Sequence, residues 1–370
     1  MKVVFRVDSS VDMGTGHMMR CLTLADELCE NSAGISFICR LLPGNICEFV
    51  EQKGYVVHRL PGHGQLLNSE TEYTRSTHNT GVSWQVDAME TEVILKKDYP
   101  ADWLIVDNYD LDRQWESQIR PYVKKIMVID DLADRPHDCD LLLDQNLYDN
   151  IQSRYNGLVP DSCQTFLGPK HALLRKEFNE ARKKQRKRDG KVRRIFIFFG
   201  GSDPTNETAK ALEAVRLLDL ADITVDAVVG NANPYKEDIK QFCTLLPKVN
   251  YFCHVNNMAS LMANADLAIG AGGSTTWERC FLGLPTITLI VAQNQAGTTA
   301  SAAAAGAVWN LGRSSDVSAE RLAETVKKAI DNPIALKEMG QKSMELMGGK
   351  TSGSQNALIK AIMEEFDART

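Results

Sequence analysis

The chain has 370 residues, 44% of them hydrophobic and 24% charged, with a formal net charge of −6 at pH 7. This length suits one large or two medium domains with a sizeable core, and the negative charge argues against a general nucleic-acid binder. The nine cysteines are scattered without a CxxC pair, which argues against a disulfide framework and a zinc site. With neither a signal peptide nor a membrane-length apolar run, we expect a cytoplasmic protein without a membrane partner.

The first half of the chain alternates short apolar runs with stretches of helical spacing, a pattern that predicts a parallel sheet with helices on both faces. The expected strands are Val3–Asp8, Ile35–Leu41, Val56–Leu60, Trp103–Asp107, Ile126–Asp130 and Leu141–Asp144. The expected helices are Met18–Leu28, Ile46–Lys53, Val82–Lys97 and Arg113–Tyr122. Ligands of such sheets bind beyond the carboxyl ends of the strands. Polar groups follow three strands there, namely Asp107-Asn108-Tyr109, Asp130-Asp131 and Asp144-Gln145-Asn146.

The loop after the first strand is Gly14-Thr15-Gly16-His17, and a helical pattern follows it. Glycines let the backbone approach a ligand closely, and the free N–H groups at a helix start suit an anion such as a diphosphate. A histidine is unusual at a helix start, which favours Ser, Thr, Asp or Asn. The loop alone leaves two interpretations open, a capping histidine and a functional one.

A basic segment at 175–194 separates the two halves of the sequence. It is either a nucleic-acid patch or a solvated helix that links two domains. Apart from Phe178 at its edge, no aromatic residue interleaves the charges, which favours the linker. We therefore expect an N-terminal Rossmann-like domain over 1–174 and a linker over 175–194. A C-terminal Rossmann-like domain over 195–350 and a last helix over 351–370, which folds back across the junction, are expected to follow.

The second half repeats the alternation of strands and helices. Its expected strands are Ile195–Phe199, Ile223–Val229, Tyr251–His254, Asp266–Ile269 and Thr286–Val291. Its expected helices are Glu207–Leu218, Asn233–Leu245, Ser260–Asn264, Thr276–Leu282, Thr298–Gly306, Glu320–Ile330, Ile334–Met347 and Ser352–Phe366. Two such domains facing each other would leave a cleft between their strand ends.

Two glycine turns of the second half are candidate phosphate cradles. The first is Gly200-Gly201-Ser202 after its first strand, and the second is Gly272-Gly273-Ser274-Thr275 at the start of a helix. The backbone N–H groups of the second turn, with the hydroxyls of Ser274 and Thr275, suit a phosphate. Glu278, one turn further on, either complements the helix dipole or accepts hydrogen bonds from a ribose diol. The adjacent glycines favour the ribose.

The segment from Gly272 to Glu278, with Gly283-Leu284-Pro285, resembles the donor-binding segment of GT-B nucleotide-sugar enzymes, especially the N-acetylglucosaminyltransferase of peptidoglycan synthesis. A narrower resemblance is to the UDP-sugar hydrolases of pseudaminic acid biosynthesis. They convert UDP-2,4-diacetamido-2,4,6-trideoxy-β-L-altropyranose and water to the free sugar and UDP. The resemblance to these hydrolases rests on Arg6–Ser10 with Gly14–Cys21, Asp107–Tyr109, Ile129–Arg135, Leu143–Asn146 and Phe199–Asp203.

This resemblance implies a GT-B-like fold, a UDP-sugar and water as substrates, and roles for particular residues. The histidine of the family's glycine loop falls on His17, which would deprotonate the attacking water. Tyr109 and Asn294 would hold the sugar or the water. Arg20, one turn after His17, would reach a phosphate or support the loop. Gly14, Gly16, Gly201 and Ser202 join the second glycine turn in binding UDP. Neither a cofactor nor a metal is required, because backbone donors can hold the diphosphate.

Other interpretations remain beside the hydrolase. A glycosyltransferase would use the same UDP-sugar site, but no apolar patch for a lipid acceptor is evident. A non-catalytic nucleotide-sugar module is disfavoured by His17, and a dehydrogenase by the missing third glycine of the first loop. The region 76–90, which includes His78, Trp84 and Gln85, matches no pattern. The remaining histidines lack the spacing of metal ligands and are expected to be ordinary polar residues: His58, His63, His137, His171 and His254.

Overall fold

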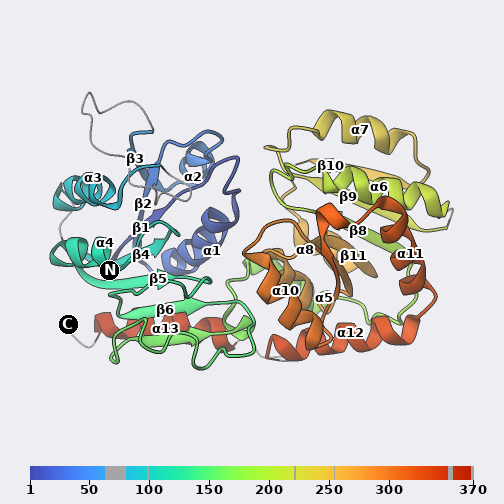
Figure 1. Cartoon of the computed structure of the whole chain (residues 1–370). Helices are drawn as coiled ribbons and strands as arrows, with labels where there is room; N and C mark the ends of the chain where they lie inside the picture. Colours follow the sequence, from blue (N-terminus) through green and yellow to red (C-terminus); the bar gives the residue numbers. More distant parts are fainter. Residues whose placement is uncertain (63–80, 98–99, 221, 254, 349–352, 368–370) are drawn as a thin grey trace. The chain divides into compact units, whose positions relative to one another are not determined.

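The computed structural model describes residues 1–62, 81–97, 100–220, 222–253, 255–348 and 353–367. The chain divides into two compact units, each built around its own parallel sheet (Figure 1). The first unit comprises Met1–Asn146, Asn150–Leu173 and Gln355–Thr370, and the second comprises Leu147–Asp149 and Leu174–Ser354. Within the described ranges, no helix is long and apolar enough to span a bilayer.

The sheet of the first unit has the strand order β3-β2-β1-β4-β5-β6-β7, and every neighbouring pair is parallel. Its strands are β1 (Lys2–Val7), β2 (Gly34–Arg40), β3 (Val56–Leu60), β4 (Ala101–Asp107), β5 (Val123–Ile129), β6 (Leu141–Asp144) and β7 (Gln164–Leu167). Its helices are α1 (Gly16–Glu30), α2 (Cys47–Gln52), α3 (Trp84–Lys97), α4 (Arg113–Ile119), the 3₁₀ turns Arg120–Tyr122 and Pro169–His171, and α13 (Gly353–Asp367). The chain builds outward from β1 to β3 and then returns to the other side of β1, so the topological switch point lies between β1 and β4.

Buried apolar side chains cover both faces of this sheet. Along β1, Val3 and Phe5 belong to one core cluster and Val4 to another, because successive side chains of a strand point to opposite faces. The first cluster includes residues of α1, α2 and α13, and the second includes residues of α3 and α4. Such continuous apolar runs are typical of parallel strands that are buried on both sides.

The last helix, α13, is part of the first unit although it follows the second unit in sequence (Figure 1). Leu358 and Ile362 are fully buried in the first core cluster. The indole nitrogen of Trp103 on β4 donates a hydrogen bond of 3.1 Å to the carbonyl of Ile362.

The sheet of the second unit has the order β10-β9-β8-β11-β12-β13, again with all neighbouring pairs parallel. Its strands are β8 (Arg194–Phe198), β9 (Thr224–Val229), β10 (Val249–Cys253), β11 (Leu267–Ala271), β12 (Thr286–Ile290) and β13 (Trp309–Arg313). Its helices are α5 (Lys176–Lys184), α6 (Glu207–Leu218), α7 (Lys236–Thr244), α8 (Met258–Asn264), α9 (Thr275–Phe281), α10 (Gln295–Ala304), the 3₁₀ turn Ser314–Asp316, α11 (Ala319–Ile330) and α12 (Pro333–Leu346). The switch point of this sheet lies between β8 and β11.

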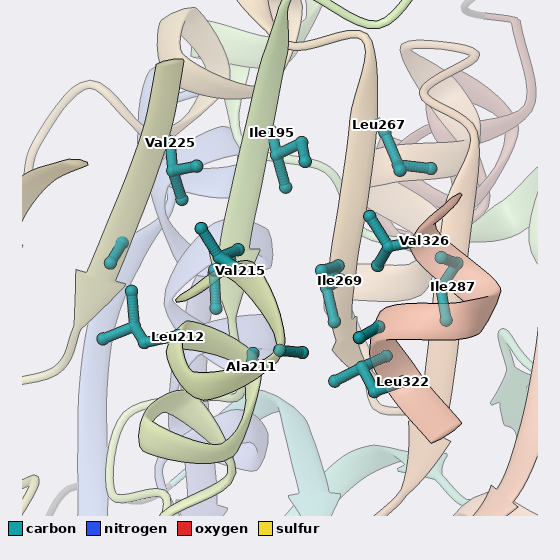
Figure 2. Packing of buried hydrophobic residues seen from close by; sticks show 14 of the residues in the cluster. Ile195, Ala211, Leu212, Val215, Val225, Leu267, Ile269, Ile287, Leu322 and Val326 are labelled. Atoms are coloured by element: carbon teal, nitrogen blue, oxygen red, sulfur yellow. The ribbon is translucent and has the colours of Figure 1, made fainter. Parts of the chain in front are cut away.

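Figure 2 shows how this sheet is covered by α6 and α11. Strand residues such as Ile195 and Ile269 meet Leu212 of α6 and Leu322 and Val326 of α11. All five side chains are fully buried. Burying a side chain of this size contributes about 1.5–3 kcal/mol each, so the sheet is held rigidly beneath the loops at its carboxyl edge.

The predicted α/β class and GT-B-like pair of Rossmann-type units are confirmed, but the edge strands β7 and β13 were missed. In β7 only Phe166 is buried, and no residue of β13 is fully buried, so neither strand has the apolar run of a central strand. The expected Asp266 start of β11 and the expected Asn233 start of α7 are also displaced, to Leu267 and Lys236.

The basic segment also differs from the expected solvated helix. Helix α5 ends at Lys184, and Phe178 within it is fully buried. Beyond the helix, Arg188 donates hydrogen bonds to backbone carbonyls of Met262, Ala263, Ala265, Leu282 and Gly283. The segment therefore belongs to the second unit, where its arginines satisfy carbonyl groups at the ends of α8 and α9.

Candidate active site

The glycine loop of the first unit places His17 at the second position of α1. Gly14 has a φ of +75°, a left-handed conformation that favours glycine, and its N–H donates to the carbonyl of Ser10 at 2.9 Å. Gly16 is the first residue of the helix, and Thr15 before it makes no side-chain cap. The tight turn therefore brings His17 back over the carboxyl end of β1.

His17 is bonded to a carboxylate across the switch point of the sheet. Its Nδ1 lies 2.6 Å from Oδ1 of Asp107, the last residue of β4. Because β4 pairs with β1, the strand before the loop, sheet topology itself brings the two side chains together. The His17 side chain keeps 11% of its surface exposed, whereas Asp107 is fully buried.

Arg20 fixes the same carboxylate from the next turn of α1. Its Nε donates to Oδ2 of Asp107 at 2.6 Å and its Nη2 donates to Oδ1 at 2.7 Å. Burial opposes the charge on Asp107, but Arg20 and His17 outweigh it and hold the pKa of that carboxyl well below its usual range. An anionic Asp107 makes Nδ1 of His17 the donor, which leaves Nε2 as the basic nitrogen.

Tyr109 and Asp131 complete the cluster. Nη1 of Arg20 donates to Oδ2 of Asp131 at 2.9 Å, and the hydroxyl of Tyr109 donates to Oδ1 at 2.5 Å. The rings of His17 and Tyr109 meet edge to face, with 4.6 Å between their centroids. Burial tends to raise the pKa of Asp131, but Arg20 and His17 lower it by a larger amount. The pKa of this carboxyl therefore also lies below its ordinary value. Arg20 is thus bonded to carboxylates through all three guanidinium nitrogens.

A second buried ion network supports this edge of the sheet. Arg6 of β1 donates to Asp8 at 2.7 Å and to Asp87 of α3 at 2.6 Å, and Arg40 of β2 also reaches Asp87 at 2.6 Å. Asp8 in turn accepts a hydrogen bond of 2.9 Å from the side chain of Asn108. Breaking a buried pair of this kind costs about 3–5 kcal/mol, so the residue next to Asp107 is strongly anchored.

In the second unit, the two predicted glycine turns follow the adjacent strands β8 and β11. A Cβ on Gly272 would lie 2.1 Å from Oγ1 of Thr299 on α10, so only glycine fits there. A Cβ on Gly230, the residue after β9, would lie 2.0 Å from the carbonyl oxygen of Gly201, which shows how closely the chain approaches the first turn. Ser202 is buried, and Gly273, Ser274 and Thr275 lead directly into α9.

Glu278 on α9 is held by only one of its two oxygens. Oε1 accepts hydrogen bonds from Nε and Nη2 of Arg175, at 3.1 and 2.9 Å. Oε2 is buried and has no hydrogen-bond partner among the described residues. Arg175 therefore orients the carboxylate and leaves one acceptor available to a hydroxyl donor.

The structure brings His17, Tyr109 and Arg20 together in the first unit. The predicted residues of the second unit lie around the glycine turns and at Asn294, which immediately precedes α10. Sequence reasoning did not assign roles to Asp107, Asp131 or Arg175. A signal existed for the two aspartates, since Asp107 ends β4 and Asp131 lies two residues after β5. Such a position does not identify the partner of the side chain.

Three of the other histidines, His58, His137 and His171, lie among the described residues. His137 is buried, and its Nδ1 lies 2.7 Å from Oε1 of Glu116. His63, His78 and His254 lie outside the described residues, as does the 76–80 part of the 76–90 region. No three His, Cys, Asp or Glu side chains converge as metal ligands within the described ranges.

Two parallel-sheet units of this kind define the GT-B class, and solved structures agree. MurG of Acinetobacter baumannii superposes with a TM-score of 0.63 at 14% identity, over 98% of this chain and all of that one. Phytolacca americana UGT2, complexed with UDP-2fluoro-glucose and pterostilbene, gives 0.64 at 12% identity over 98% of this chain and 100% of that one. These likenesses establish the fold.

Residues 195–358, most of which lie in the second unit, match the Glycosyltransferase family 28 C-terminal domain. The chain is also 29% identical to the UDP-2,4-diacetamido-2,4,6-trideoxy-beta-L-altropyranose hydrolase of Campylobacter jejuni, over 80% of this chain and 94% of that protein. The resemblance inferred from the motifs is thereby confirmed.

Two further relatives are longer than the matched region. The uncharacterized protein MJ1062 of Methanocaldococcus jannaschii is 25% identical over 78% of this chain, which spans 55% of that protein. The spore coat polysaccharide biosynthesis protein SpsG of Bacillus subtilis is 29% identical over 59% of this chain and 64% of its own length.

Proposed function

We propose that the protein hydrolyses a UDP-linked sugar at the anomeric carbon, releasing UDP and the free sugar. The substrate we propose is UDP-2,4-diacetamido-2,4,6-trideoxy-β-L-altropyranose, on which the Campylobacter relative acts by name, and the reaction would serve nonulosonate (pseudaminic acid) biosynthesis. The observation that carries the proposal is the bond between His17 and the anionic Asp107. A histidine oriented by a buried carboxylate is an established arrangement for a general base.

In this mechanism Nε2 of His17 takes a proton from water while the water oxygen attacks the anomeric carbon. The bond between that carbon and the β-phosphate oxygen breaks, and its electron pair leaves with UDP. Asp107 stabilises the imidazolium that forms, because Nδ1 already donates to it at 2.6 Å. Tyr109 and Asn294 hold the sugar or the water in place.

UDP is bound in this proposal by the second unit. Backbone N–H groups of Gly273, Ser274 and Thr275 stabilise the charge that develops on the leaving diphosphate, while the N–H of Gly272 donates to the carbonyl of Leu289 at 3.2 Å and fixes the start of the turn. Oε2 of Glu278, buried and without a protein partner, accepts a ribose hydroxyl. Further contacts come from Gly201 and Ser202 and from the first loop through Gly14 and Gly16.

A second candidate is a glycosyltransferase that uses the same UDP-sugar. It is favoured by the Glycosyltransferase family 28 C-terminal domain over residues 195–358. In that reaction His17 would deprotonate an acceptor hydroxyl in place of water. The fold alone does not distinguish the two, because one fold hosts many reactions.

A panel of UDP-sugars, each incubated with the protein in the presence and absence of sugar acceptors, tests the proposal. Hydrolysis predicts equal amounts of UDP and free sugar without any acceptor. UDP release that depends on an acceptor and yields a glycoside supports the transferase instead. Binding without UDP release from any sugar would leave only a nucleotide-sugar-binding module.

A further inference from the structure

Arg279 on α9 is a buried cation that forms no ion pair with any of the described residues. Only 1% of its surface is exposed, and it is among the largest fully buried side chains. Its Nη2 donates to the carbonyl of Ala271 at 2.6 Å and to Oγ1 of Thr276 at 3.0 Å. Nε and Nη1 have no hydrogen-bond partner among the described residues. The neighbouring Glu278 is bonded through Oε1 to Arg175.

The guanidinium lies at the switch point of the second sheet. A Cβ on Gly270 would be 2.5 Å from Nη1 of Arg279 and 2.5 Å from the carbonyl oxygen of Phe198. Gly270 and Phe198 pair in register on β11 and β8. Each glycine turn begins two residues further on, at Gly200 and Gly272, so the guanidinium lies close to the start of both turns.

A lone buried charge is unfavourable unless something compensates it. Burial lowers the pKa of Arg279 to about 10, which still leaves the guanidinium protonated at neutral pH. Cys280 and Glu278 offset part of this fall in pKa. An anion near the carboxyl edge of the sheet, where the turns present backbone N–H groups, would supply the remaining compensation.

We propose that Arg279 is the buried counter-charge for a diphosphate bound at the two glycine turns, and that it acts through the field across the backbone without touching the phosphates. Arg279 is thus a positioning residue. Its bond to the Ala271 carbonyl orients the second turn, and its charge selects ligands by their number of phosphates. The identity of the anion as the diphosphate of UDP rests on the function proposed above.

Calorimetry tests this role by measuring how tightly uridine, UMP and UDP bind. The proteins compared are the wild type, Arg279→Gln and Arg279→Lys. We expect Arg279→Gln to weaken UDP binding about tenfold or more, UMP binding less, and uridine binding not at all. Arg279→Lys keeps the charge and should retain most of the UDP affinity. Arg193→Gln is a matched control, because that arginine is exposed and paired with Asp189 at 2.7 Å.

The possible outcomes separate this inference from the proposed function. If both Arg279 variants weaken uridine and UDP binding equally, Arg279 merely packs the turn and the inference fails. Unchanged UDP binding by Arg279→Gln overturns it as well. A wild type that binds UDP no better than uridine contradicts the proposed function itself.

The wild type alone provides a further test should Arg279→Gln not fold. A buried charge is poorly screened, so the ratio of UDP to uridine affinity should change little between low and high salt. A steep fall in that ratio would assign the selectivity to exposed cations and overturn the inference.

Discussion

The two units present opposite chemistry at equivalent places in their sheets. At the switch point between β1 and β4, His17 and Arg20 are both bonded to carboxylates. At the switch point between β8 and β11 there are two glycine turns above a guanidinium that has no carboxylate partner among the described residues. The first arrangement satisfies its charges internally, whereas the second leaves polar groups unsatisfied.

This difference is what we expect if the first unit supplies the reactive side chain and the second unit binds the nucleotide, although both have the same architecture. Internal ion pairs fix the orientation of a reactive side chain before any ligand arrives, and such preorganisation is what general-base catalysis requires. Unsatisfied buried groups, such as Oε2 of Glu278 and Oγ1 of Thr299, favour binding of a polar ligand because they are costly on their own. The comparison predicts that changes in the first unit impair turnover and changes in the second impair binding.

The largest expected effect is that of His17→Asn. The amide cannot accept the proton from water, so turnover of the UDP-sugar should fall by about 10²-fold or more. UDP affinity should change little, because most of the proposed nucleotide contacts come from the other unit and those of the first loop are made by Gly14 and Gly16. Steady-state kinetics with calorimetry would show this split, and His58→Asn on β3 is the control. A near-native rate for His17→Asn would refute the mechanism.

The Asp107→Asn variant tests the orientation of His17. An amide oxygen still accepts from Nδ1, but it neither stabilises the imidazolium nor balances Arg20. We expect turnover to fall by about 10²-fold and the free energy of unfolding to fall by about 3 kcal/mol. Urea unfolding and turnover are the measurements, and retained UDP binding shows that the fold persists. A stable variant with normal turnover would remove Asp107 from the mechanism.

In the second unit, Glu278→Gln should affect binding in preference to turnover. Losing a charged acceptor for a ribose hydroxyl costs about 1.5–3 kcal/mol, so UDP should bind at least about tenfold more weakly. An analogue of UDP that lacks both ribose hydroxyls should bind wild type and variant equally. Equal loss for both ligands would mean that Glu278 serves only to hold Arg175.

The smallest expected effect is that of Asp144, a carboxyl of the first unit whose pKa is shifted in the opposite direction to that of Asp107. Burial raises the pKa of Asp144 to about 7. The neighbouring carboxylates of Asp131 and Asp130 add to this rise, whereas the Asn146 N–H and Arg154 oppose it. Its folded pKa exceeds the unfolded value of about 3.9. Its stabilising contribution is therefore complete below pH 4 and is lost as pH rises towards 7.

We expect Asp144→Asn to reduce the loss of stability between pH 5 and pH 8, because the amide does not ionise. Urea midpoints at the two pH values, for variant and wild type, measure this loss. Parallel pH profiles would show that Asp144 does not titrate in this range. Asp107, whose pKa is depressed, shows the opposite sign and contributes stability that disappears only in acid.

Much of the fold could be predicted because central parallel strands are continuously apolar. Leu141–Asp144 matches the observed β6, which is buried throughout, residue for residue. Val56–Leu60 matches β3 equally well, although that strand lies at an edge of its sheet. The edge strand β7 escaped because its exposed residues carry no such pattern. The candidate site was proposed from its loops, since glycine turns after strands are local features of the sequence.

What the sequence by itself determined is the alternation of strands and helices, the glycine turns and the presence of His17 at a helix start. These depend on neighbouring residues and on side-chain periodicity. Only the tertiary structure decided which charges are paired. His17 and Asp107 are 90 positions apart and meet because β1 and β4 are adjacent. Arg279 looks like an ordinary helical arginine in sequence, and it becomes a lone buried charge only because β8 and β11 enclose it.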